Sequence, residues 1–83
     1  MYAVIVEKFV VKQLQKISQP DYRKIRAALS NLASNPRPTG YLKLKGRDGY
    51  RIRIGDYRII YEINDNQLLV LIITIAHRKD VYE

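Results

Sequence analysis

The chain has 83 residues, with 15 Lys and Arg against 8 Asp and Glu, so its formal net charge at pH 7 is +7. This length predicts one domain over residues 1–83, because it leaves no room for a second hydrophobic core. The absence of cysteine excludes disulfides and thiolate metal sites and fits a reducing cytosol. A basic surface attracts polyanions, first of all nucleic acid, although an acidic protein would satisfy the same field and some basic domains bind neither.

No segment has the pattern of a signal peptide or of a membrane-spanning helix. The apolar run at residues 3–6 is far too short for the core of a signal peptide. The longest apolar stretch, residues 68–76, is well below the roughly 20 residues that cross a bilayer, and it predicts a buried strand. We therefore expect a cytoplasmic protein that does not bind membranes.

The first half of the chain predicts one strand and two helices. Residues 2–6 are β-branched and aromatic, which favours a strand. Residues 7–34 carry apolar side chains at helical spacing and predict an antiparallel helical hairpin with one apolar side. Ser18 is the expected N-cap of the second helix, with Pro20 in its first turn and Asp21 where the helix dipole favours an acid.

The second half alternates like a sheet. Four strands are predicted, at residues 41–45, 50–54, 57–63 and 68–76. The last of them is apolar on both faces, so we expect it to be central and covered by the helices. The predicted fold is α+β: an N-terminal strand, an antiparallel helical hairpin, and then a four-stranded, mostly antiparallel sheet region with the helices packed on one sheet face.

A predicted β-hairpin at residues 50–63 is the most informative feature. Its two-residue loop of Gly55 and Asp56 fits a type II′ turn, which fixes the register. Arg53 then faces Arg58, and Arg51 shares their face, while isoleucines and tyrosines share the face to be buried. Like charges opposed across strands destabilise by about 0.2–1 kcal/mol. Two interpretations stay open: an ordinary solvated face, or an anion site in which arginine forks match phosphate oxygens.

The polar tail offers few catalytic groups. Tyr82 beside several guanidinium groups would have its ionised form favoured, although it could equally be an aromatic lid, and the lone His77 could be a surface residue. There is no pair of histidines and no cluster of carboxylates at metal-ligand spacing, so we expect no metal and no cofactor. An enzyme built on this chain would use arginine, lysine and tyrosine, which limits it mostly to phosphate chemistry on a substrate that carries its own nucleophile.

Four segments together resemble the RelE/ParE superfamily of type II toxins, namely residues 44–46 (LKG), 50–54 (YRIRI), 55–61 (GDYRIIY) and 77–82 (HRKDVY). The predicted β-αα-ββββ order is also that of the superfamily, so the resemblance covers essentially the whole chain, and it is closer to the RelE branch than to ParE. RelE-like toxins enter the ribosomal A site and cut the mRNA codon there without a metal. ParE-like toxins inhibit DNA gyrase and generally lack the basic and tyrosine residues of the cleavage site.

The resemblance implies a catalytic set that consists of Arg51, Arg53, Arg58, Arg78 and Tyr82. RelE-like toxins often have lysines on the third strand, and arginine is a poorer acid or base, so Arg51 and Arg53 are expected to stabilise charge. Tyr82 is expected to assist deprotonation of the RNA 2′-OH, and Arg78 to stand near the leaving 5′ oxygen. Contacts to ribosomal RNA and mRNA phosphates are expected from Lys43, Lys45, Arg47, His77, Lys12 and Lys16.

The partners that the resemblance implies are a cognate acidic antitoxin, the ribosome and mRNA. An oligomer is expected only through the antitoxin. Two other functions stay open at this point: a ParE-like gyrase inhibitor, which is a protein-binding activity without catalysis, and a catalytically inactive relic that binds RNA or antitoxin.

Overall fold

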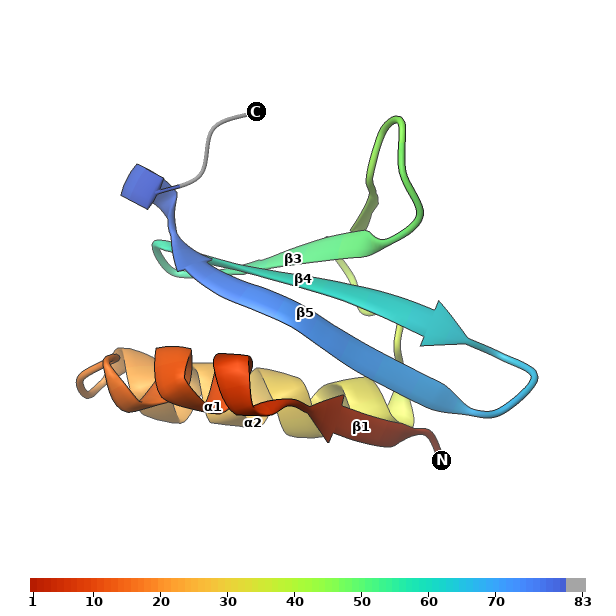
Figure 1. Cartoon of the computed structure of the whole chain (residues 1–83), viewed down its shortest axis with the longest axis horizontal. Helices are drawn as coiled ribbons and strands as arrows, with labels where there is room; N and C mark the ends of the chain where they lie inside the picture. Colours follow the sequence, from red (N-terminus) through yellow and green to blue (C-terminus); the bar gives the residue numbers. More distant parts are fainter. Residues whose placement is uncertain (81–83) are drawn as a thin grey trace.

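The chain folds into a mixed sheet with both helices on one of its faces (Figure 1). The computed structural model describes residues 1–80, the side chain of Asp80 excepted. The elements are β1 (Ala3–Val6), α1 (Lys8–Gln15), α2 (Asp21–Ser34), β2 (Leu42–Lys43), β3 (Tyr50–Ile54), β4 (Tyr57–Asn64), β5 (Leu69–His77) and the 3-10 turn η1 (Arg78–Asp80). The strand order is β1-β5-β4-β3-β2, with β1 parallel to β5 and the other neighbours antiparallel, which confirms the predicted α+β fold. Neither helix of the described chain is long and apolar enough to cross a membrane.

The core lies between the sheet and the helices, and the sheet contributes the face of the hairpin that was predicted to be buried. Burying an isoleucine side chain stabilises the fold by about 1.5–3 kcal/mol, so this face orients the whole sheet. Because side chains alternate along a strand, the arginines of the hairpin are directed to the opposite, open face. The buried side chains are Val10, Leu14, Ile17, Ile25, Leu29 and Leu32 from the helical half and Ile52, Ile59, Tyr61, Val70, Ile72 and Ile75 from the strands.

The prediction for the last strand is only partly right. β5 does lie inside the sheet, between β1 and β4. Both helices pack on the same side, however, so the face of β5 that carries Leu69 and Leu71 is half-buried rather than covered by a helix. An apolar strand in this protein therefore contributes to the open face of the sheet as well as to the core.

The predicted cap of α2 is wrong. The helix begins at Asp21, Pro20 occupies the N-cap position, and the side chain of Ser18 makes no cap. The carbonyl oxygen of Ser18 instead accepts a hydrogen bond from the Tyr22 N–H at 3.1 Å. Oε1 of Gln19 accepts one from the Arg23 N–H at 3.2 Å, so a glutamine side chain satisfies a first-turn donor that we expected the serine to satisfy.

The β2–β3 connection leaves the sheet earlier than predicted. Only Leu42 and Lys43 pair with β3, although residues 41–45 alternate like a strand. Gly46 and Gly49 have φ values of 74° and 130°, which turn the backbone away from the strand direction. The segment therefore forms a loop that rises from the sheet on the side opposite the helices (Figure 1, green).

The side chain of Gln13 links α1 to the part of the β5 edge that does not pair with β1. Since β1 pairs only with the first half of β5, the second half of that edge is covered by α1. Oε1 of Gln13 accepts a hydrogen bond from the Ile75 N–H at 2.8 Å, and its Nε2 donates to Oγ1 of Thr74 at 2.9 Å. One amide side chain thus takes the place of a neighbouring strand.

A second set of hydrogen bonds links three segments at the other end of the sheet. Arg37 makes a paired contact with Asp65, with Nη2 to Oδ2 at 3.0 Å and Nη1 to Oδ1 at 3.3 Å. The Tyr2 hydroxyl donates to the same carboxylate at 2.6 Å, and the buried Tyr61 hydroxyl donates to the Pro36 carbonyl at 2.7 Å. The N-terminus, the segment after α2 and the β4–β5 turn are therefore linked together.

Candidate nucleic-acid interface

The hairpin places three arginines on the open face of the sheet, as the sequence predicted. Arg53 lies opposite Arg58 across β3 and β4, and Arg51 lies opposite Ile60. This register follows from the two-residue turn, in which Gly55 takes a φ of 59° that favours glycine. Paired strands hold these side chains on a rigid support, which is what a preorganised anion site needs.

A cationic cavity of about 720 Å³ lies on the same open face. Its floor comes from β3, β4 and β5, and its wall is β2 with the loop that follows. Of its ten lining residues five are basic and none is acidic, so the positive charges act on a shared concave surface. The lining consists of Leu42, Lys43, Leu44, Lys45, Arg47, Arg51, Arg58, Ile60, Thr74 and Ala76.

Arg58 is the most constrained cation of this cavity. Its side chain is half-buried, and its Nε atom is shielded from solvent. Burial lowers the pKa of the Arg58 guanidinium, and the positive charges of Arg51 and Arg53 lower that pKa further. The guanidinium still keeps its proton at neutral pH. A phosphate placed against these arginines would offset both their repulsion and the desolvation of Arg58.

Arg78 stands where β5 meets the turn of the hairpin. Its backbone N–H donates to the Asp56 carbonyl at 2.7 Å, and its Nε lies 3.6 Å from Oδ1 of the Asp56 carboxylate. The β4–β5 register places Arg58 opposite Ala76, two residues before Arg78. Tyr82, the other predicted catalytic residue of the tail, lies outside the described residues.

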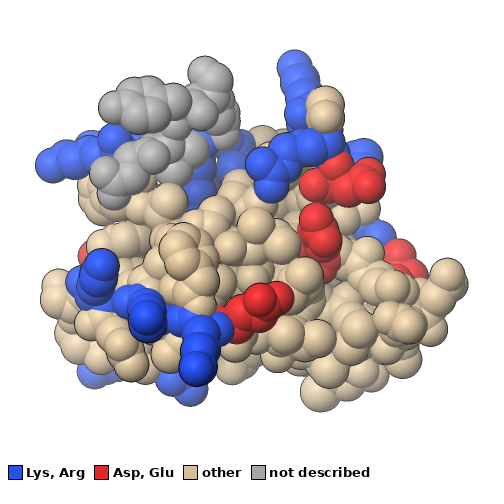
Figure 2. All heavy atoms as spheres, viewed as in Figure 1, with Lys and Arg blue, Asp and Glu red and all other residues tan. Residues whose placement is uncertain are grey.

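One predicted catalytic residue, Arg53, and three predicted RNA-contact residues do not line the cavity. Arg53 is exposed beside Arg58 and does not line it. His77 lies on the helix-facing side of the sheet, where its ring meets Tyr57 edge-on at 5.1 Å between centroids. Lys12 and Lys16 are exposed on the helical layer, across the sheet from the cavity. Figure 2 accordingly shows one group of basic side chains above the sheet and another over the helices.

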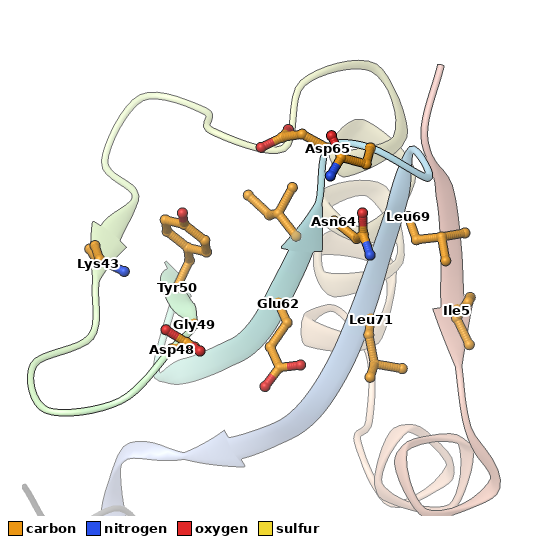
Figure 3. Close-up of a pocket in the computed structure, with 12 residues that line it drawn as sticks. Ile5, Lys43, Asp48, Gly49, Tyr50, Glu62, Asn64, Asp65, Leu69 and Leu71 are labelled. Carbon is orange, nitrogen blue, oxygen red and sulfur yellow. The ribbon is translucent and has the colours of Figure 1, made fainter.

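A second hollow of about 610 Å³ occupies the other end of the open face (Figure 3). Asp48, Glu62 and Asp65 line it, so its carboxylates would repel a phosphate. Lys43 lines both hollows, and its Nζ lies 5.4 Å from the centroid of the Tyr50 ring. The charge of the lining therefore distinguishes the two hollows and favours the arginine cavity for an RNA backbone.

Sequence reasoning missed two parts of the site. The cavity floor includes Thr74 and Ala76, which a continuous apolar strand does not reveal as surface residues. Asp56 was identified only as a turn residue, yet it contacts Arg78. The sequence contains one indication of the contact between Asp56 and Arg78, namely that the hairpin turn must lie beside the end of the last strand.

This fold is the one found in toxins of type II toxin–antitoxin systems. The family described as "ParE toxin of type II toxin-antitoxin system, parDE" matches residues 4–82, so the chain belongs to that family. The match spans almost the whole sequence, including both strands of the arginine hairpin and the tail.

Within the RelE/ParE superfamily the chain lies in the RelE-like branch, as the motifs predicted. It is 29% identical over 86 residues to a Methanocaldococcus jannaschii protein named as a candidate RelE1 toxin, covering 99% of this chain and 96% of that one. It is 34% identical to a chain of the archaeal RelE–RelB complex from Pyrococcus horikoshii OT3, with a TM-score of 0.85 and coverage of 96% and 98%. The isolated E. coli RelE toxin shares the fold at 22% identity, with a TM-score of 0.79 and coverage of 93% and 84%.

Proposed function

We propose that this toxin is a ribosome-dependent mRNA endonuclease that cleaves A-site codons without a metal, through attack of the RNA 2′-OH. The observation that carries the proposal is the cavity in which Arg51 and Arg58 face the open side of the sheet beside a basic wall. Inhibition of gyrase requires a surface that binds a protein. A phosphate, by contrast, would stabilise a half-buried arginine that lies among like charges, as Arg58 does.

The reaction needs charge stabilisation more than strong acids or bases. The 2′ oxygen attacks the adjacent phosphorus, the bond from phosphorus to the 5′ oxygen breaks, and the products are a 2′,3′-cyclic phosphate and a 5′-hydroxyl. Negative charge grows on the non-bridging oxygens during this step. Arg51, Arg53 and Arg58 would stabilise that charge, and losing one such preorganised donor typically costs a factor of about 10²–10³ in rate.

Proton transfer falls to the tail. Tyr82 would take the proton from the 2′-OH, aided by nearby positive charge that favours the tyrosinate. Arg78 would stabilise the leaving 5′ oxygen, since a guanidinium gives up its proton too reluctantly to act as an acid. The 5′ oxygen would take its proton from water, which gives the 5′-hydroxyl product. A site with such weak acid–base groups depends on a substrate held for in-line attack, and the ribosome would provide that positioning.

The remaining basic residues would position RNA. Lys43, Lys45 and Arg47 form the wall of the cavity and would contact mRNA or ribosomal RNA phosphates, with an affinity that falls steeply as salt is added. Lys12 and Lys16, on the opposite layer, would contact ribosomal RNA from the other side of the toxin. A free toxin of net charge +7 also suits a cognate acidic antitoxin. Solved relatives from Pyrococcus horikoshii and E. coli are complexes of RelE with RelB.

Primer extension on translated mRNA after induction tests the proposal. Wild type should give breaks positioned by codons, and Tyr82→Phe and Arg78→Ala should abolish them while ribosome binding stays largely intact. If both variants remain fully toxic, the assignment of the catalytic residues is wrong.

The second candidate is inhibition of DNA gyrase, which is favoured by the match to the family described as ParE toxin. It predicts stalled replication and DNA damage signalling after induction, with intact mRNA. The same induced cultures distinguish the two functions, because codon-positioned breaks and DNA damage signals are read from separate samples of one time course.

A further inference from the structure

The turn of the arginine hairpin carries an acidic residue, Asp56. Between Tyr50 and Tyr61 the sequence has three arginines and one carboxylate, Asp56. The proposed chemistry assigns Asp56 no part. The turn between β3 and β4 lies beside the end of β5 and η1 (Figure 1), and the Asp56 carbonyl in this turn accepts a hydrogen bond from the Arg78 N–H.

Asp56 holds Arg78 at two points. The hydrogen bond from the Arg78 N–H to the Asp56 carbonyl extends the β4–β5 pairing one step beyond Tyr57 and His77. It fixes where the Arg78 backbone lies but leaves a long and flexible side chain undetermined. The Asp56 carboxylate, with Oδ1 at 3.6 Å from Nε, biases that side chain.

The charges around the turn explain why such a bias is needed. Arg53 and Arg58 lie opposite each other at the last pair but one before the turn. Their positive charges would push the guanidinium of Arg78 away from the arginine face, into solvent. A carboxylate at the turn opposes that repulsion. Both side chains of the Arg78–Asp56 pair are more than half exposed, at 69% and 58%, so the bias amounts to a factor of about 1.5–5 in rotamer population.

The contact also leaves Arg78 able to bind an anion. A guanidinium has five N–H groups, and Nε supplies one of them. The two terminal amino groups can therefore face a phosphate while Nε stays beside the carboxylate.

We propose that Asp56 is a positioning residue for Arg78. It holds the guanidinium at the turn end of the arginine face before RNA arrives, and it does not touch the RNA itself. This inference rests on the proposed function, because Arg78 matters for catalysis only if the toxin cleaves RNA.

Three variants separate the charge of Asp56 from its place in the turn. Asp56→Asn keeps a residue type that suits turns and removes the charge, whereas Asp56→Glu keeps the charge on a longer side chain. Asp48→Asn is the matched control, because Asp48 is an exposed loop acid that lines the other hollow. All three should unfold at the wild-type temperature, since exposed ion pairs contribute little to stability.

Two measurements test the proposal. The first is the ¹⁵N heteronuclear NOE of the Arg78 Nε–H in the free toxin, which should fall in Asp56→Asn, stay largely intact in Asp56→Glu and not change in Asp48→Asn. The second is single-turnover cleavage on programmed ribosomes. The rate constant at saturating ribosome should fall by a factor of about 1.5–5 in Asp56→Asn and recover in Asp56→Glu, while the ribosome concentration for half-saturation stays the same.

The two measurements distinguish failure of the Asp56 proposal from failure of the proposed function. If Asp56→Asn leaves both the Arg78 signal and the cleavage rate at wild-type values, or if Asp56→Glu is as impaired as Asp56→Asn, the carboxylate does not position Arg78. If the wild-type toxin cleaves no mRNA, the proposed function fails. The NMR comparison then still decides whether Asp56 orders Arg78.

Discussion

Replacing Gln13 by leucine should destabilise this protein more than its half-exposed position suggests. The change removes the acceptor of the Ile75 N–H at 2.8 Å and the donor to Thr74 at 2.9 Å. A buried donor left without a partner costs about 1–3 kcal/mol, and this site is only partly buried, so we expect a loss of about 1–2 kcal/mol. For a domain of this size each kcal/mol lowers the melting temperature by about 4–8 °C, which gives a fall of about 5–15 °C.

Thermal unfolding followed by circular dichroism measures this fall, and Gln15→Leu is the matched control. Gln15 is exposed on the same helix, so the same chemical change there should alter stability by no more than about 0.5 kcal/mol. A double-mutant cycle with Thr74→Val isolates the second hydrogen bond and should give a coupling energy of about 0.5–1 kcal/mol. Equal melting temperatures for Gln13→Leu and Gln15→Leu would refute the view that the amide replaces a missing strand.

Three further predictions concern pH and the cationic cavity. Burial raises the pKa of the Tyr61 hydroxyl to about 12, so stability should be full below about pH 10 and fall from pH 10 to 12, a dependence that urea titrations should show to be weaker in Tyr61→Phe. The hydrogen bond from Arg37 holds the pKa of Asp65 below its usual range, so part of the stability present above about pH 4 is lost as pH falls below it, and Arg37→Gln should weaken that acid dependence in the same titrations. Arg51→Gln should lower single-turnover mRNA cleavage by about 10²–10³, whereas Arg47→Gln should mainly weaken ribosome binding and flatten its salt dependence; equal losses of rate in the two variants would contradict the division between catalytic floor and binding wall.

Much of the site could be predicted from the hairpin alone. A two-residue turn that begins with glycine allows one register, and that register sets Arg53 against Arg58. The amphipathic helices then decide which face is buried, because they must cover the isoleucines and tyrosines. Local rules were sufficient here since each residue pair lies close along the chain.

The rest of the site depends on an irregularity that the sequence conceals. Ile60 pairs with Thr74 and Tyr61 with Ile72, so Ile73 is an extra residue in β5. Val70 and Ile72 face the helices before this bulge, and after it Ile75 does. The bulge therefore moves Thr74 to the open face and His77 to the helix side. In a strand that is apolar throughout, no periodicity marks such a shift, and so the sequence did not reveal that His77 lies on the helix side of the sheet.

The pairing of the first strand with the last sets the order in which this toxin can be built. The residues of β1 are synthesised first, but their partner strand β5 comes from the end of the chain, and the two run parallel. β5 also supplies part of the cavity floor and leads into Arg78, so no partial chain holds a complete set of cationic groups. Contacts between such distant segments form slowly, because the chain loses much entropy before they are made. The cationic cavity is therefore complete only after β5, the last strand of the chain, has been synthesised.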